Sequence, residues 1–196
     1  MTDNKRRVGI FSGSFNPIHA GHMILANYIV EFSDLDEVWF VVSPHNPLKN
    51  ADDLLDDDIR LRMTELAVEG FEKFKVSDIE FSMPKPSYTI DTMNKLSDEN
   101  PDIDFTLIIG ADSWNDIHKW KNHSELATRY KLIIYPRLGF EIKINEEFTS
   151  NVHVLYAPVV QVSSTLVRNM IYAGKEVRAF LPQPVYEYVK QHRLYL

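Results

Sequence analysis

The sequence predicts an α/β protein with a Rossmann-like, doubly wound fold, in which helices cover both faces of a mainly parallel sheet. Two observations predict it. Short apolar runs alternate along the chain with segments whose apolar residues recur at helical spacing. The apolar runs are continuous rather than interrupted by polar residues at every second position, which is typical of parallel strands buried on both faces.

Six segments are expected to form the strands of this sheet. The run at 105–109 is the clearest, because it is almost wholly apolar and ends at Gly110. The run at 75–79 is weaker, because polar residues interrupt it. The expected strands are residues 8–11, 38–42, 75–79, 105–109, 132–135 and 152–156.

Seven segments are expected to form helices between and after the strands. Aspartates occupy positions 56–58, where the dipole of a helix starting there favours negative charge. Ser163 suits the N-cap of a later helix, and Gly174 suits the position just after its end. The expected helices are residues 21–31, 56–71, 89–96, 113–118, 124–128, 163–172 and 185–191. The expected apolar face of the second helix consists of Ile59, Met63, Leu66 and Ala67.

The length of 196 residues suits one domain, and we expect residues 1–196 to form it. Its last part, about residues 160–196, is expected to be a helical extension packed on the sheet. Hydrophobic residues make up 44% of the chain and charged residues 25%, which is ordinary for a protein with a well-developed core.

The composition excludes several classes of function. The chain carries 21 basic and 28 acidic residues, and its net charge of −7 disfavours non-specific binding to DNA or RNA. It has no cysteine, so disulfides, a thiol nucleophile, iron–sulfur clusters and cysteine zinc sites are excluded. The chain contains no apolar run of about 18 residues, and its polar start is unlike a signal peptide. We therefore expect a cytoplasmic protein with no membrane partner, and a homo-oligomer is compatible with the sequence.

The most informative segment joins the first expected strand to the first expected helix. Gly13 and Gly21 allow its backbone to approach a ligand, and the helix N-terminus offers N–H groups to an anion. His19 and His22 are three residues apart, so both imidazoles could face one point and donate to phosphate oxygens. Two other interpretations stay open. One histidine could cap the helix while the other is exposed, or the pair could bind zinc, although no third ligand lies nearby.

Two further segments follow expected strand ends. One begins a helix. In one interpretation Ser87 or Thr89 only caps its first turn; in a second, compatible one, exposed N–H groups there could hold a carboxylate. In the other segment, Trp120 lies between Lys119 and Lys121. A half-exposed aromatic ring beside lysines suits stacking on a flat, charged ring.

The start of the helix at 163–172 carries a third candidate group. Arg168 lies off the apolar line formed by Leu166 and Met170. With Ser164 and Thr165 donating beside it, Arg168 would clamp a phosphate. The alternative is that Arg168 is an ordinary solvated helix residue.

Four motifs together resemble those of the bacterial nicotinate-nucleotide adenylyltransferase family, within the nucleotidyltransferase superfamily that carries an HxGH motif. They are GSFNPIHAGH from position 13, PSYTIDT from 86, GADSW…HKW from 110 and VSSTLVR from 162. The resemblance spans almost the whole chain. The first and last motifs are shared across the superfamily, whereas the middle two indicate this family. The sequence departs from the pattern at Ser12 and Asn16, where many members have glycine and aspartate.

The resemblance implies an enzyme of NAD biosynthesis that joins ATP and nicotinate mononucleotide to give nicotinate adenine dinucleotide and pyrophosphate. Mg²⁺ would accompany ATP, with no metal ligand from protein side chains. The implied catalytic residues are His19, His22 and Arg168. The implied ATP-binding residues are Gly13, Ser14, Phe15, Gly21, Gly110, Asp112, Arg137, Ser164 and Thr165. A phosphate loop would contribute His45 and Lys49, and the mononucleotide would contact Tyr88, Thr89, Trp120 and Lys121.

The implied roles follow the chemistry of phosphoryl transfer. The nucleophile is the mononucleotide phosphate, which is anionic at neutral pH, so no strong general base is required. Catalysis then depends on positioning and on charge stabilisation during in-line attack at the α-phosphorus. Two alternatives stay open: a sibling enzyme that uses phosphopantetheine or nicotinamide mononucleotide, and a nucleotide-sensing module that binds ATP without transferring it.

Overall fold

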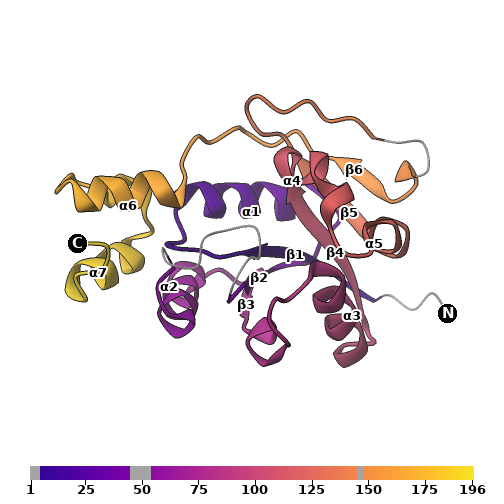
Figure 1. Cartoon of the computed structure of the whole chain (residues 1–196), viewed down its shortest axis with the longest axis horizontal. Helices are drawn as coiled ribbons and strands as arrows, with labels where there is room; N and C mark the ends of the chain where they lie inside the picture. Colours follow the sequence, from indigo (N-terminus) through magenta and orange to yellow (C-terminus); the bar gives the residue numbers. More distant parts are fainter. Residues whose placement is uncertain (1–4, 45–53, 145–147) are drawn as a thin grey trace.

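The computed structural model describes residues 5–44, 54–144 and 148–196. Its centre is a six-stranded, all-parallel sheet with the strand order β3-β2-β1-β4-β5-β6 (Figure 1). The expected Rossmann-like α/β class is confirmed. The chain crosses between the two halves of the sheet at β1 and β4, so a ligand crevice is expected at their carboxyl ends. The strands are β1 (Arg6–Gly13), β2 (Glu37–Val42), β3 (Phe74–Ser77), β4 (Ile103–Gly110), β5 (Lys131–Tyr135) and β6 (Val152–Val154).

The helices form two core clusters with opposite faces of the sheet. One cluster contains apolar side chains of α1, α2, α6 and α7, and the other contains those of α3, α4 and α5. No helix in the described part of the chain is long and apolar enough to cross a membrane. The α-helices are α1 (Ala20–Phe32), α2 (Asp57–Val68), α3 (Thr89–Glu99), α4 (Ala111–Asn115), α5 (His123–Arg129), α6 (Ser164–Tyr172) and α7 (Gln183–Gln191). The 3₁₀ helices are η2 (Ile79–Ser82), η3 (Ile117–Lys119) and η5 (Arg178–Phe180).

The central strand shows why the apolar runs are continuous. Val8 and Ile10 of β1 pack in the cluster that contains α3, whereas Phe11 packs in the cluster that contains α1. Successive side chains of a strand point to opposite faces, and both faces of this sheet are covered. Every position along β1 from Val8 to Phe11 is therefore buried.

The C-terminal helices lie beyond one end of the sheet, next to α1 and α2 (Figure 1). Their buried side chains belong to the core cluster of α1 and α2, and α7 packs against α2. Ser163 is the N-cap of α6, and Gly174 follows its C-cap with a φ of 66°, as expected. The description of the chain as one domain with a helical extension from about residue 160 stays a prediction.

Several expected element ends differ from the structure. The expected helix 113–118 is two elements, α4 and η3. Three other elements end earlier than expected, each for a local reason. β3 ends at Ser77, because Ile79 already begins η2. β6 ends at Val154, because a turn joins Ala157 N–H to Leu155 O. α2 ends at Val68, where Gly70 adopts a φ of 85° and turns the chain toward β3.

Two expected helix faces are also shifted. In α6 the buried line runs through Val167 and Ile171, while Leu166 is 39% exposed. In α2 the fully buried positions include Arg60 and Thr64 beside the expected Met63 and Ala67. An arginine on the buried face of a helix needs polar partners for its guanidinium, and those partners lie at the ends of β1 and β2.

Candidate active site

The loop between β1 and α1 holds its backbone in an unfavourable conformation. Phe15 has a φ of 43°, in the left-handed region that a residue with a Cβ disfavours. Distant arginines bond the carbonyls on either side of it: Arg60 donates to Ser14 O at 2.7 Å, and Arg168 donates to Asn16 O at 2.9 Å. The loop then leads to His19, the N-cap residue of α1. Tertiary contacts therefore hold the conformation that brings the histidines to the strand ends.

The two histidines of this loop lie together, as their spacing predicted. The rings of His19 and His22 are stacked, with centroids 3.7 Å apart and planes 19° apart. Nδ1 of His22 accepts a hydrogen bond from the backbone N–H of His19 at 3.2 Å. A neutral His22 therefore carries its proton on Nε2 and can donate from that atom. Phe15 packs edge-on against the His22 ring at 5.1 Å, which further fixes its direction.

His19 is neutral at physiological pH. It is 4% exposed, and burial, followed by the charge of Arg137, lowers its pKa to about 4. Its buried Nδ1 has no hydrogen-bond partner among the residues that the structure describes. A buried polar atom without a partner is costly, and a ligand that bonds to it would remove that cost.

We expect His19 to make the ligand-free protein less stable in mild acid. In the unfolded chain its pKa is near 6.5, and in the folded protein it is about 4, so between these values the unfolded state binds the proton. The free energy of unfolding therefore keeps its full value above pH 6.5 as far as His19 is concerned. It falls by about 3 kcal/mol in all as the pH drops toward 4.

Denaturant unfolding of the wild type and His19→Asn at pH 7 and pH 4 measures this contribution. The wild type should lose more free energy of unfolding than the variant, by about 3 kcal/mol. The exposed His153 provides the matched control, and His153→Asn should behave as the wild type does. Equal losses in all three proteins would contradict a buried, neutral His19.

Residues after β4 and β5 complete the same pocket. Arg137 Nε lies 3.6 Å from Asp112 Oδ1, and Arg137 donates to the Tyr135 hydroxyl at 3.0 Å. A pocket beside them is lined by His19, Gly21, His22, Tyr135, Arg137 and residues 158–160, among others. A Cβ at Gly110 would overlap Asp112 Oδ1 and come within 3.1 Å of Arg137 Nε, so a larger residue here would displace these two side chains. The structure thus brings together Gly21, both histidines and Arg137 in one pocket, with Asp112 and Gly110 adjoining Arg137.

The start of α6 is attached to the loop after β1 by side-chain hydrogen bonds. Arg168 bonds to Asn16 O and, at 3.4 Å, to Thr165 Oγ1, while Ser164 Oγ donates to Pro17 O at 2.8 Å. These contacts place the three predicted α6 residues beside the loop. Arg168 is therefore half-buried and partnered, which differs from the alternative of an ordinary solvated residue.

A separate group of predicted residues surrounds the start of α3. Lys121 Nζ lies 4.8 Å from the centre of the Tyr88 ring and pairs with Asp91 at 2.8 Å. Tyr88 is the N-cap residue of α3, so the helix N–H groups follow it directly. Trp120 is half-buried against the core cluster of α3 to α5. Tyr88, Thr89 and Lys121 thus lie together at one helix start, and Trp120 precedes Lys121 in the chain.

The interpretation that Ser87 or Thr89 caps α3 is wrong, and the reason reveals a residue that the sequence reasoning missed. Neither Ser87 nor Thr89 caps the helix. The Ser87 hydroxyl instead donates to Glu80 Oε2 at 2.8 Å, and Thr92 Oγ1 donates to Glu80 Oε1 at 3.0 Å. The buried carboxylate of Glu80 therefore fixes the segment that carries Tyr88.

Two more residues that hold the loop after β1 escaped the sequence reasoning. For Arg60 the sequence does contain a signal: this residue lies three residues before Met63, and this spacing places it on the buried face of α2. Tyr195, which donates to Asn16 Oδ1 at 2.8 Å, gave no signal, because the two residues are 179 positions apart. The predicted His45 and Lys49 lie outside the residues that the structure describes.

Comparisons with known proteins agree on one family. The model of the cytidylyltransferase-like family matches residues 10–170. A probable nicotinate-nucleotide adenylyltransferase of Bacteroides fragilis is 48% identical over 187 residues, which covers 95% of this chain and 92% of the relative. Another from Flavobacterium johnsoniae is 44% identical over 191 residues, covering 96% of this chain and 98% of the relative.

Solved structures show the same fold at lower identity. The nicotinic acid mononucleotide adenylyltransferase of Plasmodium falciparum, in complex with NaAD, matches with a TM-score of 0.80 at 21% identity, and 97% of each chain is covered. A structure from Vibrio parahaemolyticus, described as a putative nicotinate-nucleotide adenylyltransferase, matches with a TM-score of 0.73 at 21% identity, and the match covers 97% of this chain and 95% of that chain. With relatives 44–48% identical over nearly its whole length, this chain belongs to the cytidylyltransferase-like family and, within it, to the nicotinate-nucleotide adenylyltransferases.

Proposed function

We propose that this protein transfers the adenylyl group of ATP to nicotinate mononucleotide, giving nicotinate adenine dinucleotide and pyrophosphate. The observation that carries the proposal is the stacked pair of His19 and His22, which lies beside Arg137 at the carboxyl-end edge of the sheet. The chain that carries this pair belongs to the nicotinate-nucleotide adenylyltransferases. Two nicotinic acid mononucleotide adenylyltransferase structures of the same fold from Plasmodium falciparum, one complexed with NaAD and one with APC, also support the proposal.

The arrangement suits a reaction that needs positioning and charge stabilisation rather than a strong base. The mononucleotide phosphate attacks the α-phosphorus in line, and pyrophosphate leaves on the opposite side. In this proposal the Nε2–H of His22 donates to the oxygens that gain charge in the transition state. His19, which is neutral, pairs its free Nδ1 with an ATP phosphate or a phosphate-bound water. Arg168 and the Thr165 hydroxyl hold the β- and γ-phosphates, whereas the predicted donor Ser164 already gives its hydroxyl proton to Pro17 O.

The acceptor would lie at the start of α3. The backbone N–H groups that follow Tyr88 are suited to the nicotinate carboxylate, because a helix N-terminus favours negative charge. Lys121 adds a positive charge at the Tyr88 ring. Trp120 would stack on the pyridine ring, and Asp112 would accept from a sugar hydroxyl.

Mg²⁺, the cellular location and the assembly state stay predictions. In residues 5–44, 54–144 and 148–196 no three His, Asp or Glu side chains gather at one point. We propose that Mg²⁺ arrives bound to the phosphates of ATP, where it would neutralise charge on the polyphosphate. The predicted cytoplasmic location and the predicted homo-oligomer are open to fractionation and to sedimentation of the purified protein.

A three-acceptor assay tests the proposal. Purified protein with ATP and Mg²⁺ is given nicotinate mononucleotide, nicotinamide mononucleotide or phosphopantetheine, and pyrophosphate release is measured. Turnover should be fastest with nicotinate mononucleotide. Faster turnover with either other acceptor would identify a sibling enzyme, and ATP binding without pyrophosphate release from any acceptor would identify a sensing module.

We expect Trp120→Ala to weaken the binding of the acceptor, nicotinate mononucleotide, without weakening the binding of ATP. Stacking of a ring on an aromatic side chain contributes about 1–3 kcal/mol, so the KM for nicotinate mononucleotide should rise by roughly 10-fold to 100-fold. The KM for ATP should stay within about twofold. Steady-state kinetics with each substrate varied in turn gives both values, and Trp120→Phe, which keeps a ring, should retain most of the affinity. Equal increases in both KM values would count against stacking.

A further inference from the structure

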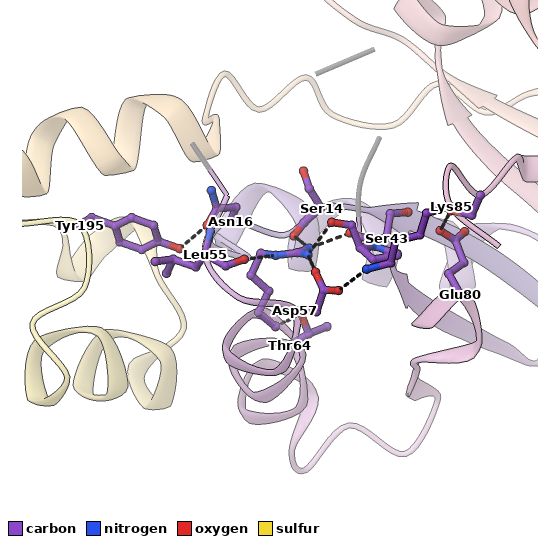
Figure 2. Close-up of polar contacts among 12 residues, drawn as sticks. Ser14, Asn16, Ser43, Leu55, Asp57, Thr64, Glu80, Lys85 and Tyr195 are labelled. Atoms are coloured by element: carbon purple, nitrogen blue, oxygen red, sulfur yellow. Dashed lines mark hydrogen bonds and ion pairs between the residues drawn. The ribbon is translucent and has the colours of Figure 1, made fainter. Parts of the chain in front are cut away.

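The guanidinium of Arg60 is the most completely bonded charged group in the described structure. The side chain is 0% exposed, and a guanidinium has five N–H donors. Nε–H donates to Leu55 O at 2.9 Å, and Nη1 donates to Ser14 O at 2.7 Å and Ser43 O at 2.8 Å. Nη2 donates to Pro44 O at 3.0 Å and to the carboxylate of Asp57. All five donors are therefore used. Figure 2 shows Ser14, Ser43, Leu55 and Asp57 gathered around this side chain.

The acceptors of Arg60 come from three separate pieces of the active-site edge. Ser14 follows β1, Ser43 and Pro44 follow β2, and Leu55 and Asp57 lie at the start of α2. A buried ion pair is often no better for stability than apolar packing, so packing alone does not explain an arginine here. What an apolar side chain could not do is fix the direction of four backbone carbonyls at once.

The bond from Arg60 to Ser14 O determines where the next N–H points. The carbonyl of Ser14 and the N–H of Phe15 belong to one planar trans peptide and point in opposite directions. With the carbonyl directed at the buried guanidinium, the Phe15 N–H is directed away from it. None of the hydrogen bonds found among the described residues uses this N–H.

The same bond also maintains the unfavourable backbone of Phe15. With a φ of 43°, Phe15 would relax if its neighbours were free. Arg60 holds the carbonyl before it, and Arg168 holds the carbonyl after it. A lysine at position 60 has only three donors and no planar fork, so it cannot satisfy five acceptors.

We propose that Arg60 is a positioning residue for the transfer reaction, because it orients the Ser14–Phe15 peptide so that the Phe15 N–H donates to an ATP phosphate. The inference rests on the proposed function for the identity of the ligand. Arg60 itself touches no substrate. Its effect reaches ATP through the backbone of the loop that leads to His19.

Variants of Arg60, with a matched control on the same helix, test whether Arg60 affects the binding of ATP. Arg60→Lys keeps the charge and Arg60→Gln removes it, while Arg62→Gln changes an exposed arginine that pairs only with Glu65 in the described structure. In Arg60→Lys the KM for ATP should rise by at least 10-fold, and the KM for nicotinate mononucleotide should stay within twofold. Arg62→Gln should match the wild type. If Arg60→Lys lowers kcat in proportion to the folded fraction and changes neither KM, its role is packing alone and the proposal is overturned.

A spectroscopic measurement on the wild type does not depend on whether the variants fold. With ¹⁵N-labelled phenylalanine, the amide resonance of Phe15 should shift when the non-reactive analogue α,β-methylene-ATP is added. An unchanged Phe15 amide at saturating analogue would overturn the proposal. Neither analogue binding nor the shift requires an acceptor, so this test can fail while the three-acceptor assay succeeds, and the reverse.

Discussion

Replacing His22 with alanine is expected to reduce turnover by about 10²-fold to 10³-fold, the usual cost of removing one preorganised donor to developing charge. The ring is held on three sides, by the stacked His19, by the edge of Phe15 and by the hydrogen bond from His19 N–H to Nδ1. That bond leaves the proton of neutral His22 on Nε2, so the donor direction is set before ATP binds. The fold should survive, with a loss of about 1 kcal/mol for the missing hydrogen bond.

Two amide variants test which nitrogen of His22 matters. The amide of glutamine can reach the position of Nε2, whereas that of asparagine reaches only the position of Nδ1. If Nε2–H is the catalytic donor, His22→Gln should retain more kcat than His22→Asn. The exposed His153 gives the control, since His153→Ala should leave kcat unchanged. A folded His22→Ala enzyme with near-normal turnover would remove His22 from the mechanism.

Local features of this site were readable from the sequence because single residues determine them. The run from Val8 to Phe11 is apolar because both faces of β1 are covered. Ser163 caps α6 because its hydroxyl can accept from the N–H of Leu166 three residues later. His19 and His22 meet because the spacing across a helix start brings their rings together.

The missed features depend on partners far away in the chain. Arg60 bonds to backbone carbonyls, which every residue has, so no side-chain type at position 14 or 43 announces the contact. Tyr195 and Asn16 meet only once α6 and α7 have packed beside α1 and α2. The side-chain oxygen of Asn16 accepts from the Tyr195 hydroxyl and from Leu55 N–H. Because both are donors, an aspartate oxygen could accept the same two hydrogen bonds.

Arg168→Lys should lower kcat/KM for ATP by about 100-fold, corresponding to about 3 kcal/mol of charge-assisted hydrogen bonding. The guanidinium already donates one hydrogen bond to Asn16 O and another to Thr165 Oγ1. Its remaining N–H donors, which lie in the plane of the guanidinium, can still donate to a phosphate. A lysine that kept the bond to Asn16 would have at most two donors and no fork, so it would lose either the loop or the ligand. Arg168→Met, which also loses the charge, should be at least as impaired.

The reverse reaction locates the phosphates that Arg168 holds. Pyrophosphate contains what were the β- and γ-phosphates of ATP, so in Arg168→Lys its KM should rise by about the same factor as that of ATP. The KM for nicotinate adenine dinucleotide should change by less than twofold, since its phosphates come from the α-position and from the acceptor. Arg129→Lys, on the exposed side of α5, serves as the control. If the dinucleotide KM rises while the pyrophosphate KM does not, Arg168 acts at the α-phosphate or the acceptor instead of on the leaving group.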